Sequence, residues 1–386
     1  MRQFPGTVTT LAASVAIGLV VPASITLGSA GAASAAGPES VVLTGSGWGH
    51  GRGLSQYGAK AAAEQGLDAA GILAFYYPGT ASGLAGGSVK VLITGDTSSN
   101  VVVQHRPRLK VRSLASGRSW KLRKRGAKRW KLTAKGGDTQ LSVKTTRWRK
   151  VRTIPGQAEF KGKGGTIRLY VPGGAADYRG KIRSVVPAGG QGRDTVNVVS
   201  VEKYLRGVVP AEMPATWPSQ ALRAQAIAAR TYAVFERDNN DRGAFDVWDT
   251  TRSQVYRGAD GEQPGATAAI KATAGQIRTY GGAPAFTQFS SSNGGWTAEG
   301  RQPYLKAAPD PFDPRTPWSA TVPATAIESA FPRVGDFERL ELILDTPTAG
   351  HVATVRVVGA RDTEEVEGEI FRSRLGLRST MFSVTT

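Results

Sequence analysis

One carboxylate in this sequence lies where an acid–base catalyst could be held rigidly. Glu212 belongs to the run VPAEMP at 209–214. Two prolines restrict the backbone of such a loop, so one side chain can be kept in a fixed pose beside a packed element. A partly buried carboxyl group in that setting suits proton transfer. The alternative is an ordinary exposed loop carboxylate without a catalytic role.

A long helix is predicted directly after this loop. Trp217-Pro218 supplies a first-turn proline, and nineteen residues without Gly or Pro follow it. Small and apolar residues at helical spacing form a stripe that lets this helix approach a sheet or another helix closely. The stripe consists of Leu222, Ala226, Ala229 and Ala233.

The residues around Glu212 resemble the signature of the stage II sporulation protein D / amidase enhancer LytB (SpoIID/LytB) family of cell-wall proteins. The resemblance begins with YLRGVVPAEMPATWPSQALRAQAIAARTYAV at 204–234. Further family-like words follow in order over about half of the chain. They are SQVYRG at 253–258, ATAG at 272–275, FSSSNGGWT at 289–297, PYL and DPFD at 303–313, and RSRLGLRSTMF at 372–382.

Two more family-like words lie far upstream of Glu212. GWGHGRGLSQYGA occupies 47–59 and LAFYYPGT occupies 73–80. In relatives these words follow the catalytic helix, so their order here looks permuted. Chain termini often lie close together, which makes permutation physically inexpensive, and we expect the segment to pack against the same site. A phosphate-binding loop is not indicated, because no Gly-Lys-Ser/Thr follows the glycines.

The resemblance implies a lytic transglycosylase that acts on peptidoglycan glycan strands. In that reaction the sugar's own C6 hydroxyl replaces water, so one carboxyl group, Glu212, serves as acid and then as base. An ordinary glycosidase needs two carboxyl groups. The LytB branch implies a different function, namely a non-catalytic, glycan-binding enhancer of a separate cell-wall amidase. Candidate substrate-binding residues are Ser290, Ser291, Ser292, Asn293, Trp296, His50, Gln56 and Tyr57.

The N-terminal residues and the composition suggest export. Residues 1–36 contain Arg2, an apolar stretch and a small-residue end, which is typical of a secretory signal peptide; an uncleaved anchor is the alternative. No later stretch is long enough to span a bilayer. The chain has no cysteine and three distant histidines, so we expect no disulfide, metal or other cofactor. We expect a secreted or cell-wall location.

Positive charge is concentrated in one segment. The net charge is +19, and residues 106–152 contain 18 Lys or Arg against one acid, Asp138. Arg106, Arg108, Lys110 and Arg112 alternate with other residues, which predicts a strand with a cationic face. In an exported protein we expect anionic wall polymers rather than nucleic acid as the partner, although a merely solubilising surface remains the alternative. The candidate polymer-binding residues are Arg123, Lys124, Arg125, Lys128 and Arg129.

The expected architecture is α+β and strand-dominated, a SpoIID-like fold with one principal helix after the catalytic loop. Short helices are predicted at 60–64 and 68–76, and strands include 100–104 and 195–201. The predicted organisation has four parts. They are a signal peptide at 1–36, a permuted Gly-rich segment at 37–86, a basic β-rich domain at 87–200 and a SpoIID-like catalytic domain at 201–386.

Overall fold

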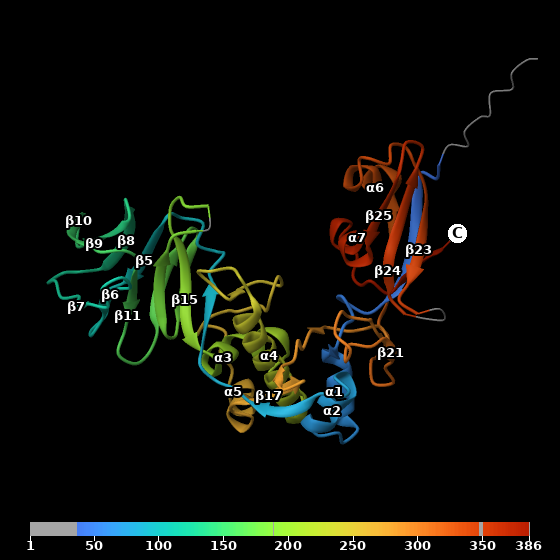
Figure 1. Ribbon diagram of the computed structural model, residues 1–386, viewed down its shortest axis with the longest axis horizontal. Coiled ribbons are helices and arrows are strands. Elements are labelled where there is room, and N and C mark those ends of the chain that lie inside the picture. The colour runs from blue at the N-terminus through green and yellow to red at the C-terminus, as the bar shows by residue number, and fades with distance from the viewer. Residues whose placement is uncertain (1–36, 188, 347–349, 386) are drawn as a thin grey trace, which may run out of the picture. The chain divides into compact units, whose positions relative to one another are not determined.

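The predicted long helix is present as α4 (Ser219–Asn239), the longest of the described helices. The computed structural model describes residues 37–187, 189–346 and 350–385 (Figure 1), so the predicted signal peptide lies outside the described residues. All four residues of the predicted stripe are buried, and α4 is in fact buried on nearly every side between residues 221 and 234. The other described helices are α1 (Gln56–Glu64), α2 (Ala69–Tyr76), α3 (Val201–Glu212), α5 (Pro264–Ala272), α6 (Ala324–Ala330) and α7 (Gly368–Arg374).

Two large sheets hold the basic region. The seven-stranded sheet has the order β16-β4-β15-β14-β11-β6-β7 and the six-stranded sheet the order β10-β9-β8-β5-β12-β13. The first consists of β16 (Val247–Trp248), β4 (Ser88–Leu92), β15 (Asp194–Ser200), β14 (Lys181–Val185), β11 (Ala158–Lys161), β6 (Lys110–Ser113) and β7 (Ser119–Lys121). The second consists of β10 (Trp148–Ile154), β9 (Asp138–Lys144), β8 (Arg129–Lys135), β5 (Asn100–Gln104), β12 (Ile167–Val171) and β13 (Gly174–Tyr178).

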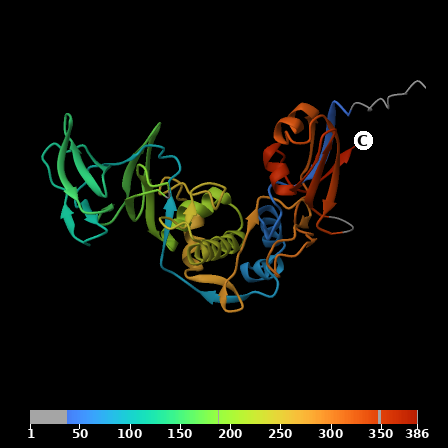
Figure 2. The ribbon, with the colours of Figure 1, turned by 45° about the horizontal axis from the view of Figure 1, so that its top comes forward.

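Smaller sheets frame the helices. A three-stranded sheet of order β18-β17-β3 lies beside α4, as Figure 2 shows for β17. Two-stranded pairs join β19 to β2 and β20 to β21. These strands are β18 (Ala283–Pro284), β17 (Gln276–Tyr280), β3 (Ala81–Leu84), β19 (Phe289–Ser290), β2 (Leu54–Ser55), β20 (Trp296–Thr297) and β21 (Ala308–Pro309).

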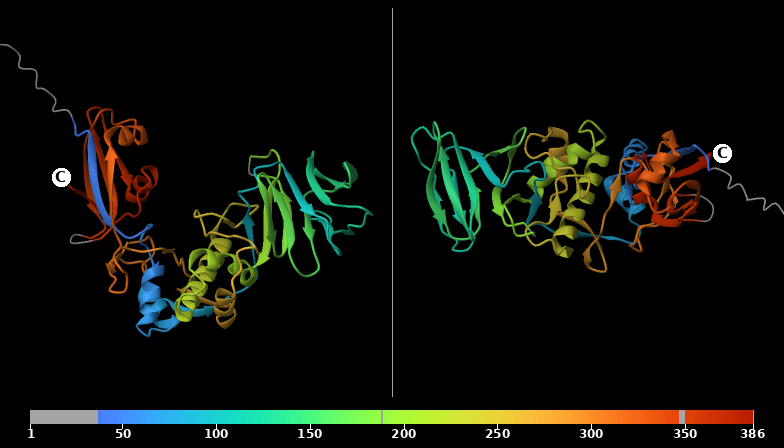
Figure 3. Two further views of the ribbon diagram at one scale, coloured as in Figure 1. Left: turned by 180° about the vertical axis from the view of Figure 1, so that it is seen from behind. Right: turned by 90° about the horizontal axis from the view of Figure 1, so that it is seen from above.

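The first described strand joins the last part of the chain. β1 (Ser40–Ser46) is the middle strand of the sheet β22-β1-β26, so it lies among C-terminal elements in both views of Figure 3. A second C-terminal sheet has the order β23-β24-β25. The strands are β22 (Pro317–Pro323), β26 (Phe382–Thr385), β23 (Phe337–Leu344), β24 (Val352–Gly359) and β25 (Thr363–Glu367).

Buried apolar residues form two clusters. One runs from Leu54 to Leu305 and includes both basic sheets and α4; the other joins Val41 and Leu43 to residues between 318 and 382. The hydrophobic cores therefore group β1 with the C-terminal strands, whereas the sequence analysis grouped it with residues 37–86. The predicted domain limits stay a prediction.

The predicted fold class is confirmed, because strands outnumber helices throughout the described chain and α4 is the principal helix. The strand predicted at 100–104 is β5, and the short helices correspond to α1 and α2. The prediction of a cationic strand from Arg106 to Arg112 is wrong in its first half. Residues 105–109 form a turn in which Arg108 has a φ of 62°, and β6 begins only at Lys110. None of the helices in the described ranges is both long and apolar enough to cross a bilayer.

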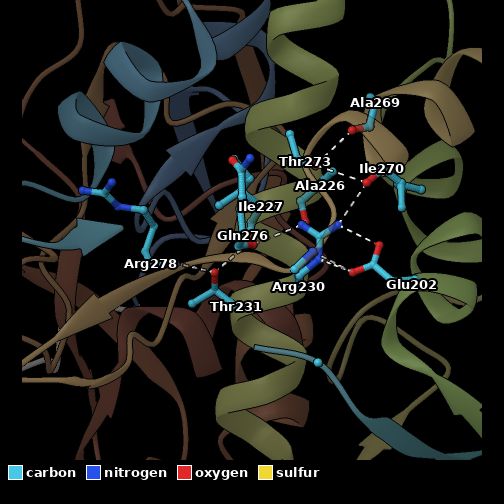
Figure 4. A network of polar contacts seen from close by, with 12 residues as sticks. Glu202, Ala226, Ile227, Arg230, Thr231, Ala269, Ile270, Thr273, Gln276 and Arg278 are labelled. Carbon is cyan, nitrogen blue, oxygen red and sulfur yellow. Dashed lines mark hydrogen bonds and ion pairs between the residues drawn. The ribbon is translucent and has the colours of Figure 1, made fainter. Parts of the chain in front are cut away.

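A buried arginine ties the central helices together. Arg230 of α4 has no exposed surface, and its Nε and Nη2 donate to the two carboxylate oxygens of Glu202 on α3 at 2.8 and 3.0 Å (Figure 4). The remaining N–H groups donate to carbonyl oxygens at 3.1–3.3 Å, so all five guanidinium donors are used. These carbonyls belong to Ala226 in α4, Ile270 in α5 and Gln276 in β17.

Replacing Arg230 by Met should lower the free energy of unfolding by about 3 kcal/mol or more, because it leaves three carbonyl oxygens and the Glu202 carboxylate without their donor. Chemical denaturation followed by circular dichroism measures this change. Arg301→Met is the matched control, since Arg301 is 92% exposed in its ion pair with Glu367 and should matter by less than about 0.5 kcal/mol. Equal losses in the two variants would contradict the assigned role of Arg230.

Candidate functional site around Glu212

Glu212 is the last residue of α3, so the predicted loop position is wrong. The helix continues through Pro210 and ends at Met213, whose N–H donates to the carbonyl of Val209 at 2.9 Å. A proline near a helix end removes only one backbone hydrogen bond. The carbonyl of Gly207, in the same part of the helix, accepts from the N–H of Arg257 at 3.1 Å. The irregular last turn of α3 therefore offers a docking point to another segment.

That segment is 254–258, and Gly207 makes its approach possible. A Cβ on Gly207 would lie 2.5 Å from the carbonyl oxygen of Gly258 and 2.7 Å from the Tyr256 ring, so only glycine fits. Gln254 is 1% exposed and accepts from the Tyr204 hydroxyl of α3 at 3.1 Å. These contacts fix the backbone between Gln254 and Gly258 against α3, and they bring Val255 to Glu212.

Two donors hold the Glu212 carboxylate. The N–H of Val255 donates to Oε1 at 3.0 Å, and Nε2 of Gln56 donates to Oε2 at 3.2 Å. The side chain is half-buried. Burial raises the pKa of Glu212 above its ordinary value, although the two hydrogen bonds and the nearby charge of Arg257 act in the opposite direction. The carboxyl group thus combines a fixed pose with a raised pKa, as a proton donor requires.

Gln56 reaches Glu212 because the upstream Gly-rich segment ends in a helix start. Ser55 is the N-cap of α1, and its Oγ accepts from the N–H of Gly58 at 3.0 Å. The same Oγ donates to Asp313 at 2.7 Å. Gly53 has a φ of 63°, and a Cβ there would lie 2.1 Å from the carbonyl oxygen of Gln288. The structure therefore brings the predicted residue Gln56 to Glu212, although 156 positions separate them in the sequence.

The side chains of Ser292 and Asn293 form hydrogen bonds to two buried aspartates. Ser292 Oγ donates to Asp313 at 2.9 Å, and Asn293 Nδ2 donates to Asp310 at 2.7 Å. The Tyr76 hydroxyl also donates to Asp310, at 2.8 Å. Asp310 and Asp313 are 0% and 5% exposed, and together they connect residues from 55 to 313. The sugar-binding role predicted for Ser292 and Asn293 stays a prediction, with these bonds favouring a structural role.

Other predicted residues also lie in the packing of this region. Ser290 is 7% exposed and pairs in parallel with Ser55, and its buried Oγ has no hydrogen-bond partner among the described residues. The carbonyl of Ser291 accepts from the N–H of Tyr57 at 3.0 Å. The carbonyl of Trp296 accepts from Nε2 of His351 at 2.7 Å. Ser291 is thus adjacent to the Gln56 helix start, whereas Trp296 contacts the C-terminal region.

His50 lies with C-terminal residues rather than with Glu212. Its Nδ1 accepts from the N–H of Arg52 at 3.0 Å, and its carbonyl accepts from Thr380 at 3.4 Å. Burial lowers the pKa of His50 to about 4, although the charge of Glu369 opposes this shift. Within the described ranges, no hydrogen bond or ion pair joins His50 to Glu212. The structure therefore separates these two predicted site residues.

Of an aromatic pair beside Gln56, Tyr57 was predicted as a site residue and Trp217 was not. Tyr57 is 45% exposed, and its ring packs edge-on against Trp217 with the ring centroids 5.0 Å apart. Nζ of Lys60 lies 5.9 Å from the centre of the Trp217 ring. The sequence analysis used Trp217 only as a helix-start signal. Its position close to the VPAEMP run could have marked Trp217 as a candidate sugar-binding residue, because exposed aromatic faces suit pyranose rings.

A cavity of about 520 Å³ lies elsewhere on α4. Its lining includes Gln220, Arg223, Gln276 and Arg278, and it does not include Glu212. Figure 4 shows Gln276 and Arg278 near α4. Arg278 is one of the polar residues of this lining, and its guanidinium donates to Thr80 and Ser82. The cavity lies where α4 packs against β17 and β3, so it is not part of the candidate site around Glu212.

The acidic side chains of the segment 246–249 make structural contacts. Asp246 is 2% exposed and accepts from the backbone N–H of Lys90 at 2.8 Å, with the Lys90 ammonium 3.0 Å away. Asp249 accepts from the Thr94 hydroxyl at 2.6 Å. Within the part of the chain that the structure describes, no cluster of three His, Cys, Asp or Glu side chains could hold a metal ion.

Four of the five predicted polymer-binding residues are exposed, and the fifth is half-buried. Arg123, Lys124, Arg125 and Lys128 are exposed in and around the turn between β7 and β8. Arg129 is half-buried on β8, with its guanidinium 3.7 Å from the centre of the Tyr170 ring. Cations also cover the tryptophans of this region, since Arg152 lies over Trp120 at 5.0 Å. Arg129 therefore has a packing role besides its charge.

A comparison with known protein families finds a match over the residues around Glu212. Residues 190–280 match the SpoIID family, described as stage II sporulation protein, and this segment spans α3, Glu212, α4 and Arg230. It excludes Gln56. The predicted resemblance to the SpoIID family is confirmed for this segment.

Curated relatives resemble only part of this chain. The chain is 30% identical over 229 residues to stage II sporulation protein D of Bacillus subtilis, covering 51% of this chain and 64% of the relative. It is 38% identical over 124 residues to the amidase enhancer of Bacillus subtilis, covering 31% and 17%. An uncharacterized protein of Brachyspira hyodysenteriae is 39% identical over 115 residues, covering 30% and 31%. The chain thus spans between about a sixth and two thirds of the length of these relatives.

Replacing Gln56 by Met should raise the pKa of Glu212 further, because Met keeps the buried volume but removes a donor to the carboxylate. Carboxyl-resolved NMR titration measures this shift. Gln65→Met is the matched control at the exposed end of α1, and it should leave the titration unchanged, as should His50→Gln. A downward shift, or an equal shift in the controls, would contradict the Gln56–Glu212 contact.

Proposed function

We propose that this protein is a peptidoglycan lytic transglycosylase in which Glu212 is the general acid and base. The observation that carries this proposal is the half-buried Glu212 carboxyl group, whose pKa is raised and whose two oxygens are fixed by Val255 and Gln56. A raised pKa keeps a fraction of the group protonated at a pH where an exposed glutamate is ionised, so it can donate a proton to the leaving oxygen.

One carboxyl group suffices for this reaction. Protonated Glu212 gives its proton to the glycosidic oxygen as the C1–O bond breaks, and the resulting carboxylate takes the proton of the C6 hydroxyl as that oxygen bonds to C1. The product is a 1,6-anhydro sugar, no water is consumed, and Glu212 ends protonated. The charged side chain whose field reaches Glu212 is Arg257, which is cationic. This environment favours a single-acid mechanism over the two-carboxylate arrangement of ordinary glycosidases.

We assign glycan binding beside Glu212 to the surface around Tyr57, the exposed residue at the start of α1. We assign Tyr57 and Trp217 as the aromatic surface for a pyranose ring, since both adjoin segments that contact Glu212. Ser291 is the next candidate, because its backbone is bonded to Tyr57. The proposed setting is the cell wall, after secretion, with peptidoglycan glycan strands as substrate and anionic wall polymers as a second partner.

The second candidate function is that of a non-catalytic enhancer of a cell-wall amidase. The observation that favours it is the 38% identity to the amidase enhancer over 124 residues. In this case the same side chains around Glu212 hold glycan, and Glu212 contributes binding rather than proton transfer. The two functions predict different effects of one substitution.

Glu212→Gln should abolish release of anhydro-ended fragments from purified glycan strands, because an amide cannot carry the transferred proton. Mass analysis of the digest measures these ends. The variant should stay folded. Because burial raises the Glu212 pKa, ionisation lowers stability as the pH rises through the window above the ordinary value. Glu212→Gln should therefore have an unfolding temperature at neutral pH that is equal to or higher than that of the parent protein.

Glu64→Gln is the matched control, since Glu64 is exposed on α1 in an i,i+4 pair with Lys60 and should not alter turnover. Near-normal release of anhydro ends by Glu212→Gln would contradict the acid assignment. No release by the parent protein, combined with stimulation of an added amidase that survives Glu212→Gln, would establish the enhancer function instead.

A further inference from the structure

A row of lysines crosses four neighbouring strands of the seven-stranded sheet. Lys181 on β14 pairs with Lys161 on β11, Lys161 pairs with Lys110 on β6, and Lys110 pairs with Lys121 on β7. Directly paired residues point to the same face, and adjacent strands lie about 4.8 Å apart. Like charges placed directly opposite one another oppose sheet formation. A row of this kind therefore calls for a compensating negative charge.

The protein supplies only part of that charge. Glu159 lies on the same face one register step away, is fully buried, and forms ion pairs with Lys181, Arg183 and Arg112 at 3.0–3.5 Å. Lys161, Lys110 and Lys121 have no ion pair within the described ranges, and all three are exposed. The internal anion thus neutralises one end of the row and leaves three adjacent lysines unpaired.

These three lysines line a groove of about 770 Å³. Further cations in its lining are Arg108, Arg112, Arg123 and Lys163, and its lining contains no Asp or Glu. One wall is the loop 161–165, which Arg106 fastens by donating to the carbonyls of Gly164 and Thr166. Arg108 enters the groove from the left-handed turn with a φ of 62°, a conformation that a non-glycine residue adopts at some cost. The groove is therefore built before any ligand arrives.

We propose that this groove is a binding site for a flexible phosphodiester polymer of the polyol-phosphate type, with Lys161, Lys110 and Lys121 as its central contacts. This proposal deepens the anionic-polymer partnership named above and does not depend on catalysis by Glu212. Lysine ammonium groups and arginine forks both suit phosphate oxygens. The lining contains no aromatic side chain, whereas proteins that bind single-stranded nucleic acid stack the bases on aromatic rings. The lining thus favours a chain of phosphates without bases.

The site differs from the one predicted from charge density alone. Of the predicted polymer-binding residues, only Arg123 lines the groove. Lys124, Arg125 and Lys128 are exposed outside the lining and have no ion pair within the described ranges. Two sets of three cations are therefore available in the same segment of the protein, equal in charge and different in position. This difference separates a specific groove from a general electrostatic effect.

The test compares two triple variants of the full-length protein. Lys110→Gln/Lys121→Gln/Lys161→Gln removes the row, and Lys124→Gln/Arg125→Gln/Lys128→Gln removes the same charge outside the groove. Calorimetric titration with synthetic poly(glycerol phosphate) of one defined length should show a loss of affinity of about tenfold or more for the first variant and less than about threefold for the second. The slope of log affinity against log salt should fall by about 2 in the first variant only.

Thermal unfolding tests the same site without activity. The row variant should unfold at a temperature equal to or above that of the parent protein, because opposed like charges are removed. Added poly(glycerol phosphate) should raise the unfolding temperature of the parent protein and not that of the row variant.

Equal loss of affinity in both triple variants would overturn the proposal and leave only net charge. Tighter binding of an oligodeoxythymidine with the same number of phosphates would overturn the assignment to a polyol-phosphate polymer. Release of anhydro ends from short uncharged glycans should be unchanged in both triple variants. Failure of the catalytic proposal would appear in that assay, and failure of the groove would appear in the titration.

Discussion

The ion pair between the buried Arg230 and the half-buried Glu202 is the constraint on which the region around Glu212 depends. α4 is surrounded by other elements, and a guanidinium at its centre must satisfy five donors away from water. It does so only if α3, α5 and β17 stand in one arrangement. Arg230 more than offsets the cost of burying Glu202, and it holds the pKa of that carboxyl below its ordinary value. The far end of the same helix α3 carries Glu212, so the pose of the site carboxylate follows from this pair.

Two carboxylates with different surroundings illustrate how one fold sets different proton affinities. Glu202 faces a full guanidinium charge and stays ionised, whereas Glu212 receives two uncharged donors and a more distant cation. In Glu212 burial outweighs these contributions, and in Glu202 it does not. Glu202 lies in the first turn of α3 as a structural anion. Glu212 ends the helix where backbone from 254–258 and the side chain of Gln56 converge. This contrast supports a chemical role for the second carboxylate.

Local patterns in the sequence predicted the regular elements well. The long uninterrupted run after Pro218 predicted α4, and alternation predicted β5 with its residue limits. Local patterns failed where non-local contacts decide the backbone. Pro210 suggested a loop, but α3 continues to Glu212, and contacts with the segment 254–258 hold its last turns, among them the Arg257 N–H that donates to the Gly207 carbonyl. The alternation from Arg106 suggested a longer strand, yet Arg106 instead holds the loop at 164–166.

Side-chain meetings between distant segments were the least predictable part. Gln56 and Glu212 were both candidates by resemblance, and only the fold shows that they touch. The lysine row depends on the register of four strands drawn from residues 110 to 181, and no single segment contains that information. Ser292 and Asn293 match a family word, but the buried pair Asp310 and Asp313 takes their hydrogen bonds. The composition thus predicted which segment carries the positive charge, whereas the pairing of the strands determines how the charged side chains are arranged.

The position of β1 imposes an order on how this chain becomes complete. β1 is the middle strand between β22 and β26, so it lacks both of its neighbours until residues 317–323 and 382–385 have been synthesised. The early segment that follows β1 also supplies Gln56 and Ser55, whose partners lie more than 150 residues later. Closing such long loops is slow compared with forming local helices. A growing chain therefore cannot complete the sheet around β1, or the hydrogen bond from Ser55 to Asp313, until its C-terminal part has been made.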